Sequence, residues 1–380
     1  MTDLGVYIHY PWCRSRCPYC DFPIAVAPLN EIPHRGYLEA ILAELEVHRA
    51  AFAGRRLVSI YFGGGTPSLW PAGCMAEAAA AVRDSFDGAP DEVTIEANPV
   101  DCTPDNLAAW RAAGIDRVSI GVQSLDAGDL VSLGRDHRMG EGLAAVDAAV
   151  GAGFSRMSAD IILGAPGSRQ PLASVAALGT RAVPHLSVYE LTVEEGTPLH
   201  QRVARGEVVP ESEDRLADLY IQAHELLLEN GYEHYEVSSY ARPGARAIHN
   251  SLYWRGAEFL GLGAGAASFR RSEGGGGVRW SNHRSVGRYL ASAPDARRAE
   301  IDELDAANLA VDRIWLGLRT SDGVPLEAVP ASLLDWLSGP AGLAVVEDAR
   351  VKPTVRGFLY SNRVLARVLD LCFSSGSSRS

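Results

Sequence analysis

Three cysteines near the start of the chain form the clearest candidate for chemistry. They occur in the segment Cys13-Arg-Ser-Arg-Cys17-Pro-Tyr-Cys20. Thiolates at positions i, i+4 and i+7 of a proline-containing loop can face one point, and three thiolates leave one iron of a [4Fe–4S] cluster open to an outside ligand. The spacing therefore favours a cluster. A structural zinc site and coincidence stay open as alternatives, although zinc usually takes four ligands and His9 is the nearby fourth.

A second segment of interest is His249-Asn250-Ser-Leu-Tyr253-Trp254. On a helix, the i, i+4 spacing places His249 and Tyr253 on one side. The segment resembles a motif that is implicated in haem binding in one protein family, and this resemblance implies haem as the ligand: His and Tyr can both ligate haem iron, and Tyr253 and Trp254 could stack on a porphyrin. The alternative is an aromatic core cluster in which His249 bonds to a backbone carbonyl. Three other histidines compete as ligands: His224, His234 and His283.

Short apolar runs alternate with helical patterns through the first 240 residues. Strands are expected at 5–10, 58–62, 92–97, 117–122, 158–163 and 185–191, and helices at 37–52, 74–86, 104–113, 140–151 and 172–182. Repeated β-α units imply parallel strands with right-handed crossovers. No G-x-G-x-x-G opens an early helix, which disfavours a dinucleotide fold. Six units are fewer than the eight of a complete barrel, so we expect an open, partial (β/α)6 barrel.

The later part of the chain has a different texture. We expect an α/β protein with a partial barrel at 1–240, an α+β extension carrying the His249 segment at 241–300, a small C-terminal domain at 301–373 and a disordered tail at 374–380. The glycine-rich run that starts at Gly261 is expected in a loop or in closely packed backbone. Within the C-terminal domain, 343–346 and 357–359 are expected to form a small hairpin.

The composition limits the classes of function. The 380 residues are 47% hydrophobic and 22% charged, which is typical of a globular protein. A net charge of −12 argues against a nucleic-acid binder. No apolar run reaches the length of a membrane span, and the N-terminus does not resemble a signal peptide, so we expect a cytoplasmic protein with free thiols. The scattered cysteines are expected to be buried or incidental: Cys74, Cys102 and Cys372.

The cysteine loop resembles the signature of the radical S-adenosylmethionine (SAM) superfamily. Four further segments resemble strand ends in the branch that contains oxygen-independent coproporphyrinogen III oxidases and a family of haem chaperones: Tyr61-Phe-Gly-Gly-Gly-Thr-Pro-Ser68, Glu96-Ala-Asn-Pro99, Gly121-Val-Gln123-Ser and Asp160-Ile-Ile-Leu-Gly. The resemblance covers roughly residues 5 to 270. It implies a radical SAM fold in which the cofactor supplies the difficult chemistry and the protein orients it.

The resemblance also implies ligands. A [4Fe–4S] cluster would be held by Cys13, Cys17 and Cys20. SAM would lie at the strand ends, against Tyr7, Gly64, Gly65, Thr66, Glu96, Gln123, Arg135 and Asp160. Haem would contact His249, Asn250, Tyr253 and Trp254, in the segment that resembles the haem-binding motif of the chaperones.

Two departures separate this chain from the oxidases. The oxidases typically carry a fourth cysteine two residues after the third, where this chain has Phe22, and they carry a longer segment before the cluster, where this chain has twelve residues before Cys13. The resemblance therefore implies a haem chaperone that passes haem to acceptor proteins, with membrane respiratory enzymes as plausible recipients. Oxidative decarboxylation of coproporphyrinogen III is the main alternative. A radical SAM enzyme acting on another substrate, and a zinc-stabilised binding protein, also stay open, as does a homodimer.

Overall fold

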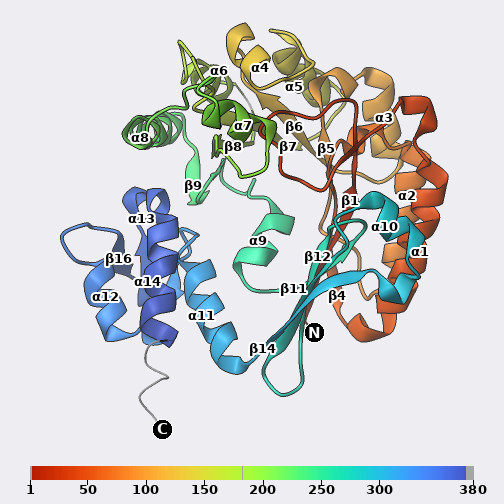
Figure 1. Cartoon of the computed structure of the whole chain (residues 1–380). Helices are drawn as coiled ribbons and strands as arrows, with labels where there is room; N and C mark the ends of the chain where they lie inside the picture. Colours follow the sequence, from red (N-terminus) through yellow and green to blue (C-terminus); the bar gives the residue numbers. More distant parts are fainter. Residues whose placement is uncertain (1, 182, 374–380) are drawn as a thin grey trace.

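The structure, a computed structural model, describes residues 2–181 and 183–373 of the chain. The tail expected at 374–380 and the side chain of Cys372 lie outside the described residues. A large sheet with helices packed on it is followed by a small unit at the C-terminal end (Figure 1). Within the described part of the chain, no helix has the length and apolar character needed to span a membrane.

Six parallel strands form the centre of the sheet, as predicted. They lie side by side in chain order: β1 (Asp3–Tyr10), β4 (Arg56–Gly64), β5 (Glu92–Ala97), β6 (Arg117–Gln123), β7 (Arg156–Leu163) and β8 (His185–Glu190). Each neighbouring pair is parallel, so every carboxyl end reaches the same edge of the sheet. That edge is where the loops after the strands can meet.

Antiparallel strands extend this core at both sides into one sheet of twelve strands. Beside β1, the strand β11 is parallel, and three antiparallel strands follow it to the first edge; beside β8, two antiparallel strands reach the other edge. These strands are β11 (Glu258–Leu262), β12 (Ala267–Arg271), β13 (Gly277–Asn282), β14 (Arg298–Leu304), β10 (Ser239–Ala241) and β9 (Glu233–Glu236). The segment 241–300 therefore continues the sheet, whose two edges are β14 and β9.

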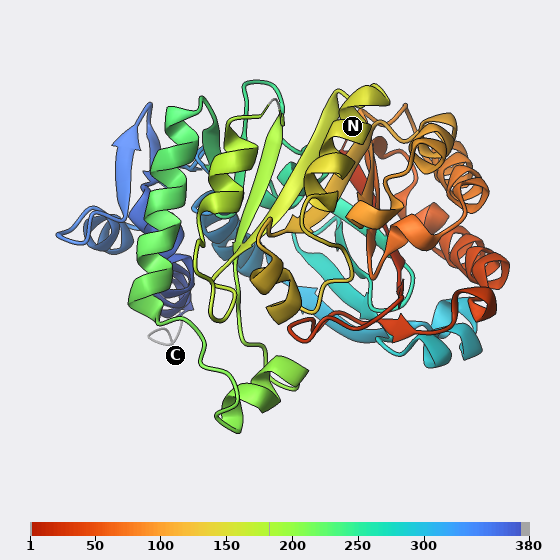
Figure 2. The same cartoon turned by 90° about the horizontal axis from the view of Figure 1, so that it is seen from above.

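Helices cover the outer face of the curved sheet, as the view from above shows (Figure 2). Those between the parallel strands are α1 (His34–Arg49), α2 (Ala72–Ser85), α3 (Pro104–Ala112), α4 (Ala127–Ser132), α5 (Glu141–Gly151) and α6 (Ala173–Gly179). Later helices are α7 (Pro198–Ala204), α8 (Glu213–Glu229), α9 (Ile248–Trp254) and α10 (Val286–Ala291). The predicted helices are confirmed to within a few residues at their ends.

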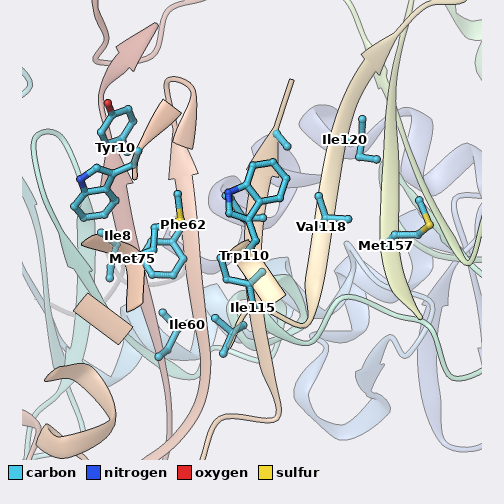
Figure 3. Packing of buried hydrophobic residues seen from close by; sticks show 14 of the residues in the cluster. Ile8, Tyr10, Ile60, Phe62, Met75, Trp110, Ile115, Val118, Ile120 and Met157 are labelled. Carbon is cyan, nitrogen blue, oxygen red and sulfur yellow. The ribbon is translucent and has the colours of Figure 1, made fainter. Parts of the chain in front are cut away.

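The main core lies between the parallel strands and these helices (Figure 3). Ile8 of β1, Phe62 of β4 and Val118 of β6 are fully buried. Successive residues of a strand point to opposite faces, so the other face of the same sheet carries polar side chains such as Asp160 of β7. Trp110 of α3 covers the same core from the helical layer.

The C-terminal unit has its own hydrophobic cluster, in which Leu333, Val351 and Val368 are fully buried. Its elements are α11 (Ala306–Gly317), β15 (Val324–Pro325), α12 (Ala331–Leu337), β16 (Ala344–Glu347), β17 (Arg350–Pro353), α13 (Val355–Leu359) and α14 (Ser361–Phe373). The predicted hairpin was only half right. Residues 357–359 are helical, because the Thr354 hydroxyl accepts a bond from the Gly357 N–H and caps α13.

The glycine run after β11 lies in closely packed backbone, as predicted. A Cβ on Gly261 would lie 2.1 Å from the carbonyl oxygen of Ala267, and one on Gly263 would lie 2.5 Å from the Tyr37 hydroxyl. Gly263 also has a φ of +105°, which side chains disfavour. These glycines let β12 and α1 approach β11.

We expect Gly261→Ala to lower the free energy of unfolding by about 1–3 kcal/mol, because backbone must move to admit the methyl group. Denaturant unfolding measures it. The control is Gly73→Ala in α2, where a Cβ meets nothing within 4 Å and an alanine raises helix stability by about 0.5–1 kcal/mol. Equal effects of the two substitutions would contradict the packing described.

Candidate functional site

A cavity of about 380 Å³ lies at the carboxyl ends of the parallel strands. It is lined by all three clustered cysteines. Seven of the eight residues assigned to SAM by resemblance also line it: Gly64, Gly65, Thr66, Glu96, Gln123, Arg135 and Asp160. The eighth, Tyr7, is not among the lining residues. Its hydroxyl is 3.1 Å from Nδ1 of His9, and its ring stacks on Tyr61.

The cysteine loop is tied to the glycine-rich turn that follows β4. The Gly65 N–H donates to the Tyr10 carbonyl at 2.8 Å, and the Thr66 N–H donates to the Trp12 carbonyl at 2.9 Å. The loop then pairs its own ends, through β2 (Trp12–Cys13) and β3 (Ala25–Val26). The turn thus holds the loop over the strand ends.

Arg135 is the cation beside the thiols. Its guanidinium donates to Cys17 Sγ at 3.6 Å, to Asn98 Oδ1 at 2.6 Å and to the Gly121 carbonyl at 3.2 Å. Arg14 also lines the cavity, but its guanidinium makes a bidentate pair with the buried Asp101. That pair anchors the cysteine loop to the segment after β5.

Burial opposes ionisation of the free thiols. Desolvation raises the pKa of Cys13 to about 11, although the Thr66 hydroxyl works in the other direction, and burial also raises the pKa of Cys20. Neutral thiols bind metal poorly, so loading must displace protons. Among the described residues, no three His, Cys, Asp or Glu side chains are grouped closely enough to hold a single ion. Three thiolates that each bind a different iron of one cluster lie farther apart than the ligands of a single ion.

The glycine turn packs closely against the first strand and the start of the cysteine loop. A Cβ on Gly64, which has a φ of +115°, would lie 2.5 Å from the His9 ring, and one on Gly65 would lie 2.8 Å from the Pro11 backbone. Glu96 fixes the turn, because its carboxylate accepts from the Gly64 N–H at 3.0 Å and from the Tyr61 hydroxyl at 2.8 Å. Glycine is therefore required at both positions.

Two buried carboxylates face the cavity. Desolvation raises the pKa of Glu96 to about 7, against the hydrogen bonds from Tyr61 and Gly64. Burial also raises the pKa of Asp160, whose carboxylate accepts from Ser119 and Ser158. Carboxyl groups whose ionised form is penalised by burial are ready to pair with a cationic ligand.

The lining of this cavity is acidic overall. Five carboxylates and two arginines line it, before any thiolate is counted. Gln123, at the end of β6, has a strained backbone, since its φ of +61° is unusual for a residue with a Cβ. A cavity of this charge suits a small cationic ligand, such as one with a sulfonium and an ammonium group.

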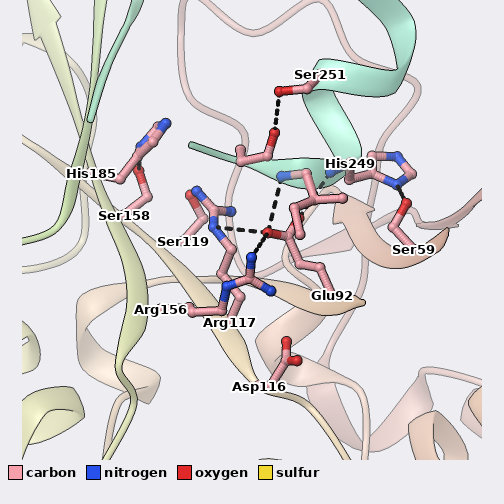
Figure 4. Close-up of polar contacts among 12 residues, drawn as sticks. Ser59, Glu92, Asp116, Arg117, Ser119, Arg156, Ser158, His185, His249 and Ser251 are labelled. Carbon is pink, nitrogen blue, oxygen red and sulfur yellow. Dashed lines mark hydrogen bonds and ion pairs between the residues drawn. The ribbon is translucent and has the colours of Figure 1, made fainter. Parts of the chain in front are cut away.

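The helix α9 lies at the other end of the parallel strands. The carboxylate of Glu92, at the start of β5, accepts from the backbone N–H groups of Ile248 and His249 at 3.1 and 3.0 Å (Figure 4). Arg117 and Arg156 pair with the same carboxylate at 3.8 and 4.0 Å. A buried, paired carboxylate thus fixes the first turn of the helix.

His249 is enclosed by its neighbours. The Ser59 hydroxyl lies 2.8 Å from Nδ1 and the Tyr253 hydroxyl lies 2.9 Å from Nε2, so both ring nitrogens are engaged. The side chain is 1% exposed, and burial lowers its pKa to about 3, so the ring is neutral. The predicted pairing of His249 with Tyr253 across one helical turn is confirmed. Asn250 and Trp254 are half-buried on the same helix.

Two of the competing histidines and the scattered cysteines lie elsewhere. His224 of α8 and His234 of β9 bond to each other through their Nδ1 atoms at 2.9 Å. Cys74 lies in α2, and Cys102 is buried after β5. Sequence reasoning did not find Asn98, Glu92 or Arg14's partner Asp101, because each acts through contacts with residues distant in the sequence.

Comparisons with known proteins agree on one family. The model of the radical SAM superfamily matches residues 7–169. The chain is 36% identical over 373 residues to the heme chaperone HemW of Mycobacterium tuberculosis, covering 96% of this chain and 94% of that protein. It is 37% identical over 308 residues to the heme chaperone HemW of Escherichia coli, covering 79% and 80%.

Two further matches are a mitochondrial protein and a solved structure. The mitochondrial radical S-adenosyl methionine domain-containing protein 1 of Mus musculus is 35% identical over 341 residues, covering 85% of this chain and 74% of that protein. Among solved structures, coproporphyrinogen III oxidase (HemN) from Escherichia coli aligns with a TM-score of 0.79 at 20% identity, covering 99% of this chain and 91% of that one. That likeness concerns the fold alone.

Glu96 makes a prediction about pH. The pKa of Glu96 is near 7 in the folded chain and about 4.5 in the unfolded chain, so between these pH values the folded chain binds one more proton than the unfolded chain. The stability that this proton contributes is fully present below about pH 4.5 and is lost as the pH rises through 7. We expect the metal-free protein to lose on the order of 3 kcal/mol over that window from this group. In Glu96→Gln the decline should be shallower by this amount, as measured by urea unfolding at pH 5 and 8. The exposed Glu229→Gln is the matched control, and an unchanged slope in Glu96→Gln would contradict the assignment.

Proposed function

The chain belongs to the radical SAM superfamily and, within it, to the HemW family of heme chaperones, and from this premise we propose that it carries haem to acceptor proteins. Membership of the superfamily implies SAM and a [4Fe–4S] cluster. Haem is included as a ligand because the relatives are named heme chaperones. Three further points stay predictions: membrane respiratory enzymes as the acceptors, a homodimeric state and a cytoplasmic location.

The cavity at the strand ends is our candidate for the two superfamily cofactors. Cys13, Cys17 and Cys20 would hold the cluster, with the Arg135 guanidinium offsetting the negative charge of the sulfurs. When bound, cluster and SAM together supply reductive cleavage of the sulfonium C–S bond. The chain's own contribution is to orient SAM by the Gly64–Gly65 turn, to offer Glu96 and Asp160 to its positive groups, and to exclude water by burial.

Phe22 is the observation in this chain that favours haem carriage over decarboxylation. It stands where the oxidases carry a fourth cysteine, and it is 56% exposed at the cysteine cavity. The buried carboxylates of this cavity do not separate the two functions, because Glu96 and Asp160 belong to the motifs that resemble both the oxidases and the chaperones. The names of the relatives that cover most of this chain support the same assignment as Phe22.

We propose that the His249 segment contributes to haem binding. The neutral His249 ring supports the Tyr253 hydroxyl, and Glu92 holds the helix that carries both. The side chains of Tyr253 and Trp254 extend from α9 toward a second, larger cleft. In this arrangement His249 orients the tyrosine.

We expect anaerobic reconstitution with iron and sulfide to give a brown protein with a broad absorbance band, because three thiolates and Arg135 meet at one cavity. Cys13→Ala should lose this band, while the matched control Cys74→Ala should keep it. Iron and sulfide analyses give the stoichiometry. A colourless protein that binds zinc instead would refute the cluster.

We expect the purified protein to bind about one haem per chain and to leave coproporphyrinogen III unchanged under anaerobic, reducing conditions with SAM. Absorbance titration measures the first, and product chromatography the second. Transfer to an apo-acceptor, seen as loss of haem from the chain, would extend the result. Sustained turnover of coproporphyrinogen III would overturn the proposed function.

A further inference from the structure

A second cleft, of about 1390 Å³, lies between the amino-terminal edge of the parallel strands and the C-terminal unit. Residues of α9 and α11 line it, together with residues of β11, β12 and β13; the two helices lie near each other in Figure 1. Tyr253 and Trp254 line this cleft and are absent from the lining of the cysteine cavity. The two cavities share no lining residue, because they lie at opposite ends of the strands.

The charge of this cleft is opposite to that of the chain. Seven arginines and four aspartates line it, an excess of three positive charges in a protein whose net charge is −12. The aspartates are already neutralised, since Arg56 pairs with Asp3 and Asp91, and two further arginines pair with the other two. The cleft therefore has positive charge to offer to an anion.

Two of these arginines are free to bind a ligand. The side chains of Arg255, after α9, and Arg313, on α11, are exposed and have no hydrogen-bond or ion-pair partner among the described residues. Each guanidinium matches a carboxylate in bidentate geometry. They come from the two helices that border the cleft, so they suit a ligand with two separate carboxylates.

The walls between these arginines are aromatic. Trp254 and Trp315 line the cleft, and the Arg319 guanidinium lies over both rings, at 4.8 Å from each ring centroid. On the strand side, Phe259 packs edge-on against Tyr253 at 4.7 Å and approaches Phe269 at 6.1 Å. These rings would contact a flat, apolar ligand and can stack on its face.

Size and charge together favour one occupant. Ligand pockets usually measure about 300–1000 Å³, so the cysteine cavity of 380 Å³, which would hold a cluster and SAM, lies at the small end of that range. The cleft, at about 1390 Å³, is more than three times as large as the cysteine cavity. It is positive where the cysteine cavity is negative, and haem carries two propionates on an apolar, planar ring.

We propose that haem binds in this cleft, with its ring against the aromatic residues of α9 and β11–β12 and its propionates on Arg255 and Arg313. This inference rests on the proposed function and gives haem a place in the molecule. The haem then lies at the end of the parallel strands opposite to the SAM cavity. Cargo and cofactor occupy separate sites, and SAM does not compete with haem.

The test is a titration of the full-length protein with ferric haem, in which the variant Arg255→Glu with Arg313→Glu is compared with wild type. Each lost charge-assisted contact costs roughly tenfold in affinity, so the double variant should bind haem roughly a hundredfold more weakly. The dimethyl ester of haem lacks the carboxylates and keeps the ring. Its affinity should be nearly the same for wild type and variant.

A matched control carries the same change of charge outside the cleft. Arg169→Glu with Arg288→Glu replaces two exposed arginines whose side chains have no partner among the described residues. It should bind haem as wild type does. A second cleft variant, Ala310→Glu, places a carboxylate on an exposed position of α11 that lines the cleft, where a helix tolerates glutamate. It should weaken haem binding while leaving thermal unfolding unchanged.

The outcomes separate this inference from the proposed function. Failure of wild type to bind haem would overturn both. Haem binding that is equal in the cleft variants and the control, or that saturating SAM displaces, would overturn the cleft and leave haem carriage standing. Selective weakening in both cleft variants, with the ester unaffected by Arg255→Glu and Arg313→Glu, supports the cleft.

Discussion

The parallel direction of the strands β1 to β8 determines what each end of this molecule can do. All carboxyl ends reach one edge, so the loops after β1, β4, β5, β6 and β7 meet there and bring the cysteines, the glycine turn and the buried carboxylates together. All amino ends reach the other edge, where the carboxylate of Glu92 meets the first N–H groups of α9. Between two parallel strands the chain must cross back to the amino-terminal edge of the sheet. The helices that form these crossovers cover the sheet.

The two ends of the strands also differ in charge. Buried carboxylates make the strand-end cavity acidic, and their pKa values are raised because burial penalises the charge; a cationic ligand relieves that penalty. The opposite cleft has surplus arginine. The two cavities thus differ in charge as well as in position, and they share no lining residue.

Sequence reasoning predicted what depends on local spacing. The six strands, the thiol triplet and the glycine turn each have a short-range signal, and Gly64 and Gly65 lie where their lack of a side chain is required. It failed where the answer depends on distant partners. Arg14 lies next to Cys13 in the chain, yet its guanidinium pairs with Asp101, and it is the distant Arg135 that contacts Cys17. The cleft could not be predicted, because its walls combine residues from 3 to 350.

The most direct test of this account is a crystal structure of the anaerobically reconstituted, haem-loaded protein with SAM, phased or mapped at the iron absorption edge. The account predicts two separate sets of iron peaks. One is a compact group of four beside Cys13, Cys17 and Cys20, and the other is a single iron in the cleft between α9 and α11. Haem density over the cysteine cavity, with an empty cleft, would contradict it.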